Sequence, residues 1–221
     1  MRPDERVGLL KRLARVRNTE VALNGRQVPT SVSILLSMLA SETDSDERYQ
    51  IYEHIVFECK FCERSDLEVE FSKKQHSEFR DLTSLTNYSQ ALISDGQFVL
   101  GLAAAKDALN IAIQEKIIIN SVAVDYVREA IRTKSVEAVN DALGALIASM
   151  GCPRTADSVL ELEWMGDAQS LGADEGLLAT IRSIANDNII VDTSDSSLAA
   201  SNPPIGPCKY RVSSEVADRE N

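Results

Sequence analysis

The sequence predicts an all-α fold, an array of about seven to eight antiparallel helices followed by a short irregular or β-hairpin C-terminal tail. Apolar residues recur every three or four positions through most of residues 1–191, as on the buried face of a helix. The dipeptide Ala108-Leu109 returns as Ala142-Leu143, an offset of 34 residues that is typical of stacked helical hairpins. Aromatic residues make up only 5% of the chain, which favours closely packed helices over a β-sandwich. We expect one helical domain over residues 1–191 and an irregular tail over 192–221.

Three helices are expected in the first 62 residues. Pro3 suits the first turn of a helix, which continues through Leu13 and Val16 and stops at Asn24-Gly25. A second helix is expected over residues 30–40. A third follows the polar turn at 42–47, with Asp44 or Ser45 as its N-cap, and its apolar stripe carries the cysteines at 59 and 62.

The middle of the chain contains two ambiguous stretches. Residues 65–72 are interpreted as a turn or the frayed start of a helix, and a helix is then expected from about residue 73 to the break at Asp95-Gly96. Residues 97–133 form either one long helix or two helices that break near 116–120. A helix over 135–150 ends at Gly151 and Pro153.

Two more helices are expected over residues 155–168 and 174–188, and the pattern then changes. Ile189–Val191 and Tyr210–Val212 are short β-like runs. Either they pair as a terminal hairpin, with a short strand near 209–212, or the tail beyond Asp192 is mobile.

Charge is spread unevenly along a chain with a net charge of −11. Residues 1–27 have seven bases and three acids, a net of +4, whereas residues 155–221 have twelve acids and four bases, a net of −8. Most of this surface would repel nucleic acid and attract a basic protein. Acidic surfaces also keep cytosolic proteins soluble, which is the simpler explanation of the same charge.

The sequence also indicates a compartment. No apolar run approaches the roughly 20 residues that span a bilayer, and the charged N-terminus lacks the apolar core of a secretory signal. Four cysteines in 221 residues do not form a typical disulfide framework. We expect a cytoplasmic protein without a membrane contact, whose oligomeric state the sequence does not indicate.

Residues 82–149 resemble the tetratricopeptide repeat in two successive copies. The family's small residue early in the first helix is matched by Ser89 and Ala123. The small residue early in the second helix is matched by Gly101 and Ser135, and the late alanine by Ala108 and Ala142. The family's aromatic position holds Tyr126 in the second copy but Leu92 in the first. Its closing proline is replaced by Ile113 and Ile147, and its tryptophan is absent.

This resemblance implies a superhelix whose concave face binds a peptide or protein segment. The family's groove-lining positions correspond to Thr86, Asn87, Gln90, Asn120, Val124 and Arg128. Asn87 and Arg128 match parts of the carboxylate clamp that some members possess, but the clamp lysines are missing. The alternative is that these polar residues are a solvated helix face.

Catalytic and metal chemistry find little support in the sequence. Cys59 and Cys62 have the CxxC spacing of redox and zinc sites, but they lie within a predicted helix, and the further ligands that zinc needs have irregular spacing. No glycine-rich phosphate loop, GxSxG or HExxH is present. We therefore expect a protein that is not an enzyme and has no metal or other cofactor.

The expected function is non-catalytic protein binding. A strongly acidic helical protein without a catalytic set suggests a bacterial immunity or antitoxin-type inhibitor that binds and neutralises a basic toxin domain. The alternative is a tetratricopeptide-like regulatory or scaffolding adaptor that binds a peptide segment.

Overall fold

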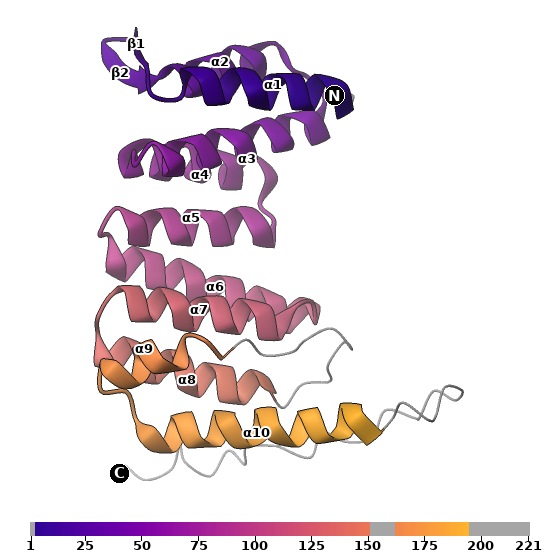
Figure 1. The fold of residues 1–221 in the computed structure, drawn as a ribbon, viewed down its shortest axis with the longest axis vertical. Helices are drawn as coiled ribbons and strands as arrows, with labels where there is room; N and C mark the ends of the chain where they lie inside the picture. Colours follow the sequence, from indigo (N-terminus) through magenta and orange to yellow (C-terminus); the bar gives the residue numbers. More distant parts are fainter. Residues whose placement is uncertain (1–2, 151–161, 195–221) are drawn as a thin grey trace. The chain divides into compact units, whose positions relative to one another are not determined.

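The computed structural model describes residues 3–150 and 162–194, which form ten helices and one two-stranded hairpin (Figure 1). The elements are α1 (Pro3–Val16), β1 (Glu20–Leu23), β2 (Arg26–Pro29), α2 (Thr30–Ser41), α3 (Ser45–Phe61), α4 (Ser65–Phe79), α5 (Leu82–Ser94), α6 (Phe98–Glu115), α7 (Ile119–Arg132), α8 (Val136–Met150), α9 (Met165–Ser170) and α10 (Glu175–Ser194). The prediction of an all-α array of antiparallel helices is confirmed.

Residue contacts divide the chain into two compact units, each described by itself below. Unit 1 is Met1–Ala104 and unit 2 is Ala105–Asn221. That residues 1–191 are a single domain therefore stays a prediction.

The helix α3 shows how the sequence specifies these elements. Asp44 is its N-cap, as predicted, and the Asp44 carboxylate accepts hydrogen bonds from the backbone N–H groups of Asp46 and Glu47. Ile51, Ile55 and Cys59 follow at helical spacing and are buried. The cap and the apolar stripe together determine where α3 begins and which face it buries.

The prediction for residues 17–29 was wrong, because a β-hairpin replaces the end of the first helix. The strands β1 and β2 pair antiparallel, with Glu20 opposite Pro29 and Leu23 opposite Arg26. Asn24 and Gly25 both have positive φ, 51° and 80°. A two-residue turn of this kind matches the twist of the strands that it joins, and Asn-Gly is its preferred sequence.

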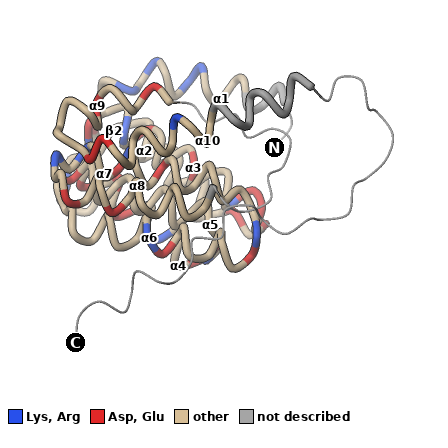
Figure 2. The backbone as a smooth tube through the Cα atoms, turned by 90° about the horizontal axis from the view of Figure 1, so that it is seen from below, with Lys and Arg blue, Asp and Glu red and all other residues tan. Residues whose placement is uncertain are grey.

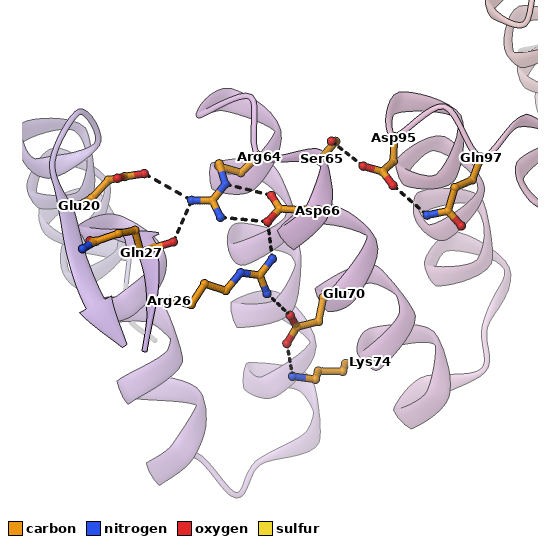
Figure 3. Close-up of polar contacts among 10 residues, drawn as sticks. All are labelled: Glu20, Arg26, Gln27, Arg64, Ser65, Asp66, Glu70, Lys74, Asp95 and Gln97. Atoms are coloured by element: carbon orange, nitrogen blue, oxygen red, sulfur yellow. Dashed lines mark hydrogen bonds and ion pairs between the residues drawn. The ribbon is translucent and has the colours of Figure 1, made fainter. Parts of the chain in front are cut away.

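Ion pairs attach this hairpin to α4 within unit 1 (Figure 3). Arg26 bonds to both Asp66 and Glu70. Arg64, just before α4, donates to the backbone carbonyl of Gln27 at 2.9 Å and pairs with Asp66 at 2.9 Å. Two arginines thus hold a short hairpin that has little apolar surface of its own.

The expected helix over 73–94 is two helices, and α4 already begins at Ser65. Arg80 adopts a left-handed conformation with φ 54°, and the side chain of Asp81 then caps α5 by accepting from the N–H of Ser84. The apolar period continues across this break, so periodicity alone did not reveal it.

The core of unit 1 lies between α1, the hairpin, α2, α3 and α4. Its buried side chains include Leu13, Val28, Val32, Leu35, Ile55, Cys59, Leu67 and Phe71. Leu13 of α1 is fully buried, and the basic residues Lys11, Arg12 and Arg15 are exposed. The first helix therefore packs on its neighbour, as the sequence favoured.

The ambiguous segment 97–133, which begins in unit 1 and continues into unit 2, resolves as two helices. The chain breaks between α6 and α7, where Lys116 and Ile118 have positive φ of 59° and 37°. The helix α7 packs on α8, which packs on α10. Buried residues of this unit include Ala108, Leu109, Ala123, Tyr126, Val127, Val139, Ala142, Leu143, Leu146, Leu178 and Ile181.

Two predictions near the C-terminus were wrong where the structure describes the chain. The helix expected over 155–168 is replaced at residues 162–164 by non-helical chain, and α9 begins only at Met165. The β-like run Ile189–Val191 is part of α10. Residues 155–161 and the tail with its expected strand near 209–212 lie outside the described residues.

None of the helices within the described ranges is both long enough and apolar enough to cross a membrane.

Candidate functional site

The first three predicted groove residues lie on α5 in unit 1. The Thr86 hydroxyl donates to the carbonyl of Leu82 at 3.0 Å, and the Asn87 amide donates to Gln75 Oε1 at 3.4 Å. Both side chains and that of Gln90 are partly buried. Thr86 and Asn87 therefore make contacts within unit 1.

The other three predicted residues lie on α7 in unit 2. Val124 is buried, with 7% of its surface exposed, and belongs to the interior. Asn120 is partly buried in the first turn of α7, and Arg128 lies two turns further along. Since each unit is described by itself, a common groove formed by α5 and α7 stays a prediction.

Arg128 lines a pocket in unit 2 with a volume of about 400 Å³. The other lining residues are Ile131 and Arg132 on α7, Asp167 on α9, and Glu163 and Trp164 just before α9. Pockets for small ligands and side chains have volumes of about 300–1,000 Å³. This pocket is our candidate site.

Both arginines of the pocket already have carboxylate neighbours on their own helix. Arg128 lies 3.7 Å from Asp125, three residues before it. Arg132 donates to both oxygens of Glu129, at 2.8 and 3.1 Å. Burial raises the pKa of Asp125, and the charge of Arg128 opposes this rise.

The two acids of the pocket differ from the arginines. Glu163 and Asp167 are exposed, and within the described part of the chain neither carboxylate takes part in an ion pair or hydrogen bond. Trp164 between them has only 4% of its surface exposed, and its indole N–H has no acceptor. The pocket thus combines an apolar wall with two arginines and with two carboxylates that form no ion pair among the described residues.

Sequence reasoning included Arg128 but missed the other lining residues. Glu163, Trp164 and Asp167 fall within the helix expected over residues 155–168, to which the sequence assigned no site. The two acids lie four residues apart beside the sole tryptophan, but only folding brings them into one pocket with Arg128.

The cysteines are packed in unit 1. Burial raises the pKa of both the Cys59 and the Cys62 thiol, so neither is an activated thiolate. Across residues 3–150 and 162–194, no three His, Cys, Asp or Glu side chains gather as a metal site would require.

Comparison with known proteins adds no relative: no family, no curated protein and no solved structure matches this chain significantly. The resemblance to the tetratricopeptide repeat accordingly stays a prediction.

Proposed function

We propose that this chain is a non-catalytic cytoplasmic protein that binds other proteins, an immunity or antitoxin-type inhibitor that neutralises a basic toxin domain. The observation that carries the proposal is the charge of unit 2. Residues 105–221 contain eighteen acids and ten bases, a net of −8, out of −11 for the whole chain.

The contacts within unit 2 support this proposal because they leave more acids than bases without a partner. Four described bases take part in ion pairs: Lys106, Arg128, Arg132 and Arg182. Among the described residues, these exposed acids have no such pair: Asp107, Glu115, Glu137, Glu163 and Asp167. Figure 2 draws the backbone with Asp and Glu positions in red and Lys and Arg positions in blue.

Such a surface has two effects on a basic partner. It raises the rate of encounter, because carboxylates without a counter-charge attract cations over about 8–10 Å at ordinary ionic strength. It also covers the partner's own anion-binding surface once bound, which is how an acidic protein would neutralise a nuclease.

The pocket favours a second candidate, the peptide-binding adaptor. Arg128, one of the predicted groove residues, lines it, and its volume of about 400 Å³ suits one or two side chains of a bound segment. An adaptor of this kind would depend more on apolar contacts than on steering by charge.

Salt dependence separates the two candidates. The protein is used to capture partners from the cytosol of its source, the partners are identified by mass spectrometry, and the association rate of the purified partner is measured at low and high salt. The inhibitor proposal predicts a basic partner whose association slows at least about tenfold when salt is raised. A partner without a basic surface, or an association rate that does not change with salt concentration, would contradict the inhibitor proposal and favour the adaptor.

Matched variants locate the charge that matters. The triple change Asp107→Asn, Glu115→Gln and Glu137→Gln neutralises three unpaired acids of unit 2 and should slow association, leaving dissociation nearly unchanged. The control Asp46→Asn, Glu53→Gln and Glu63→Gln removes the same charge from exposed positions of unit 1. Equal slowing by both triples would show that net charge acts, and not the surface of unit 2.

A further inference from the structure

Two helices of unit 1 expose apolar side chains. On α3, Phe57 is 55% exposed and Phe61 57%, and on α1, Val7 is 52% exposed and Leu10 41%. Ala14 of α1 is exposed as well. The α1 residues are spaced by three and four positions and the two phenylalanines by four, so each group forms one stripe along its helix.

Contacts between the two helices bring these stripes together. Leu13 of α1 and Ile55 of α3 are buried in the same core. Arg17, three residues beyond the last member of the α1 stripe, lies 3.9 Å from the centre of the Phe61 ring at the end of α3. Since the helices share a core and their ends meet, the stripes form one surface. This α1–α3 face consists of Val7, Leu10, Ala14, Phe57 and Phe61.

The aromatic part of this face is held in place from below. Arg17 packs on Phe61 and is itself held by two hydrogen bonds to the buried Glu58. The ring centres of Phe57 and Phe61 are 6.3 Å apart, a separation typical of packed aromatic pairs. Single exposed apolar residues are common on monomeric proteins, whereas a contiguous apolar patch marks a place where another molecule binds.

The charge around the α1–α3 face is positive, although the chain as a whole has a net charge of −11. Residues 7–17 and 53–63 carry the face, and Arg17 and Glu58 within them neutralise each other. The remaining charged side chains of these two segments are exposed and form no ion pair among the described residues. They are four bases and two acids, a net of +2: Lys11, Arg12, Arg15 and Lys60 against Glu53 and Glu63.

We propose that the α1–α3 face binds an acidic amphipathic helix of a protein partner. The apolar side of that helix covers Leu10, Phe57 and Phe61, and its carboxylates pair with Lys11 and Arg15, which directly follow two members of the α1 stripe. Apolar stripes on neighbouring helices suit a third helix, whose own apolar residues recur every three or four positions. This interaction goes beyond the proposed function, which uses the acidic surface of unit 2.

Charge favours a helix over the other molecules that could cover an apolar face. An anionic lipid surface is wider than the face and would also meet the acidic surroundings, since unit 1 has sixteen acids and thirteen bases, a net of −3. A second copy that presents the same face would place bases opposite bases. An acidic helix covers only the part of unit 1 whose charge is opposite to its own.

The test uses two synthetic helical peptides labelled with fluorescein. The first has leucine at every third or fourth position with glutamate and alanine between, and the matched peptide has glutamine in place of each glutamate. Each is titrated with the full-length protein while the fluorescence anisotropy is followed. The glutamate peptide should bind saturably and about tenfold more tightly than the glutamine peptide.

Variants of the apolar residues locate the binding surface. Leu10→Gln with Phe57→Gln should weaken binding of the glutamate peptide by about tenfold or more, because it removes two central apolar contacts. The control is Val99→Gln with Leu100→Gln, which removes two exposed apolar side chains of α6 and should bind the peptide as the wild type does. Thermal melting confirms that each variant folds.

Variants of the basic residues test the charge. Lys11→Gln with Arg15→Gln should remove the preference for glutamate over glutamine. Lys73→Gln with Arg80→Gln, which removes two exposed bases elsewhere in unit 1, should retain it. No saturable binding, equal binding of both peptides, or equal losses in the variants and their controls would overturn the proposal.

Two further measurements identify the other occupants. The wild type and the variant Leu10→Gln with Phe57→Gln are sedimented with vesicles of phosphatidylcholine and phosphatidylserine, and their masses are measured by analytical ultracentrifugation. If neither peptide binds and only the wild type sediments with vesicles, the face binds lipid and the proposal is wrong. If neither peptide binds and only the wild type is a dimer, the face joins two copies and the proposal is equally wrong.

Discussion

Arg17 and Glu58, 41 residues apart, form a bidentate ion pair in unit 1, with hydrogen bonds of 2.8 and 2.6 Å. The Glu58 side chain is only 2% exposed, and the Arg17 guanidinium also lies 3.9 Å from the centre of the Phe61 ring. The hydrogen bond to Glu58 is the main reason that the pKa of Arg17 is raised. This pair connects the end of α1 to α3.

Arg17→Ala should destabilise the fold by about 3 kcal/mol, because it leaves a buried carboxylate without its cation. Urea titration of the wild type and the variant measures this loss of unfolding free energy. Arg12→Ala, which removes an exposed arginine without an ion pair among the described residues, should change stability by less than about 0.5 kcal/mol. The double variant Arg17→Met with Glu58→Leu should recover much of the lost stability, because no buried charge is left without a partner. If the double variant is as unstable as Arg17→Ala, this explanation is wrong.

Gly25→Ala should destabilise the protein by about 1 kcal/mol, since φ is +80° and a side chain disfavours that conformation. Gly8→Ala is the matched change, because Gly8 lies inside α1 and an added Cβ would meet nothing within 4 Å. It should stabilise by about 0.5–1 kcal/mol. Thermal melting shows whether each variant melts at a lower or a higher temperature than the wild type. A stabilising Gly25→Ala would exclude the turn described above.

Gly101→Ala should destabilise unit 1 by about 1–3 kcal/mol, because the new Cβ would lie 2.6 Å from Ile93 Cδ1. Ser89 donates to the Gly101 carbonyl at 2.9 Å, so the backbone there has little freedom to move away. Adding Ile93→Ala removes both Cδ1 and Cγ1, which would lie 2.6 and 2.7 Å from the new Cβ, so the double variant should lose less stability than the sum of the two single variants. Urea titration gives the free energy of unfolding of the single and double variants. If the double variant loses as much as the two single variants together, a direct clash is ruled out.

Acidification should weaken the attachment of the hairpin to α4. Hydrogen bonds from Arg64 and then Arg26 lower the pKa of Asp66, and Lys74 and then Arg26 lower that of Glu70. Since both pKa values are lower in the folded state, the ionised carboxylates stabilise the fold above their ordinary pKa of about 4, and this contribution is lost as the pH falls below it.

The comparison of wild type with Arg26→Gln isolates this effect. The side chains of Arg26 and Asp66 are 42% and 47% exposed, so the difference in unfolding free energy at pH 7 should be under about 1 kcal/mol. It should shrink as the pH falls below about 4, and because the two arginines hold the pKa of Asp66 well below its usual range, part of it should persist at pH 2.5. A difference that is constant between pH 7 and pH 2.5 would show that Arg26 acts through packing.

Much of the helical fold could be predicted because helices follow from local patterns. The cap at Asp44, the apolar stripe of α3 and the stop at Asp95-Gly96 were all evident in the sequence, and each acts within a few residues. The hairpin could also have been found, since Asn24-Gly25 is a strong signal for a two-residue turn. It was missed because glycine also ends helices.

Other features were not available to local reasoning. The break at Arg80 depends on a left-handed residue that is not glycine, within an unbroken apolar period. The run Ile189–Val191 has β-branched residues typical of strands, yet it lies in α10, which packs on α8. Of the candidate site, only Arg128 was predicted, because a pocket depends on which helix faces which.

The sequence by itself determined that this chain forms helices, where most of them begin, and that its acidic charge is concentrated toward the C-terminus. These properties depend on residue type and on spacings of three or four positions. Tertiary structure alone decided that Glu58 would meet Arg17, and that Glu163 and Asp167 would share a pocket with arginines already neutralised on their own helix. Contacts between residues distant in the sequence depend on how helices pack, and no local pattern records that.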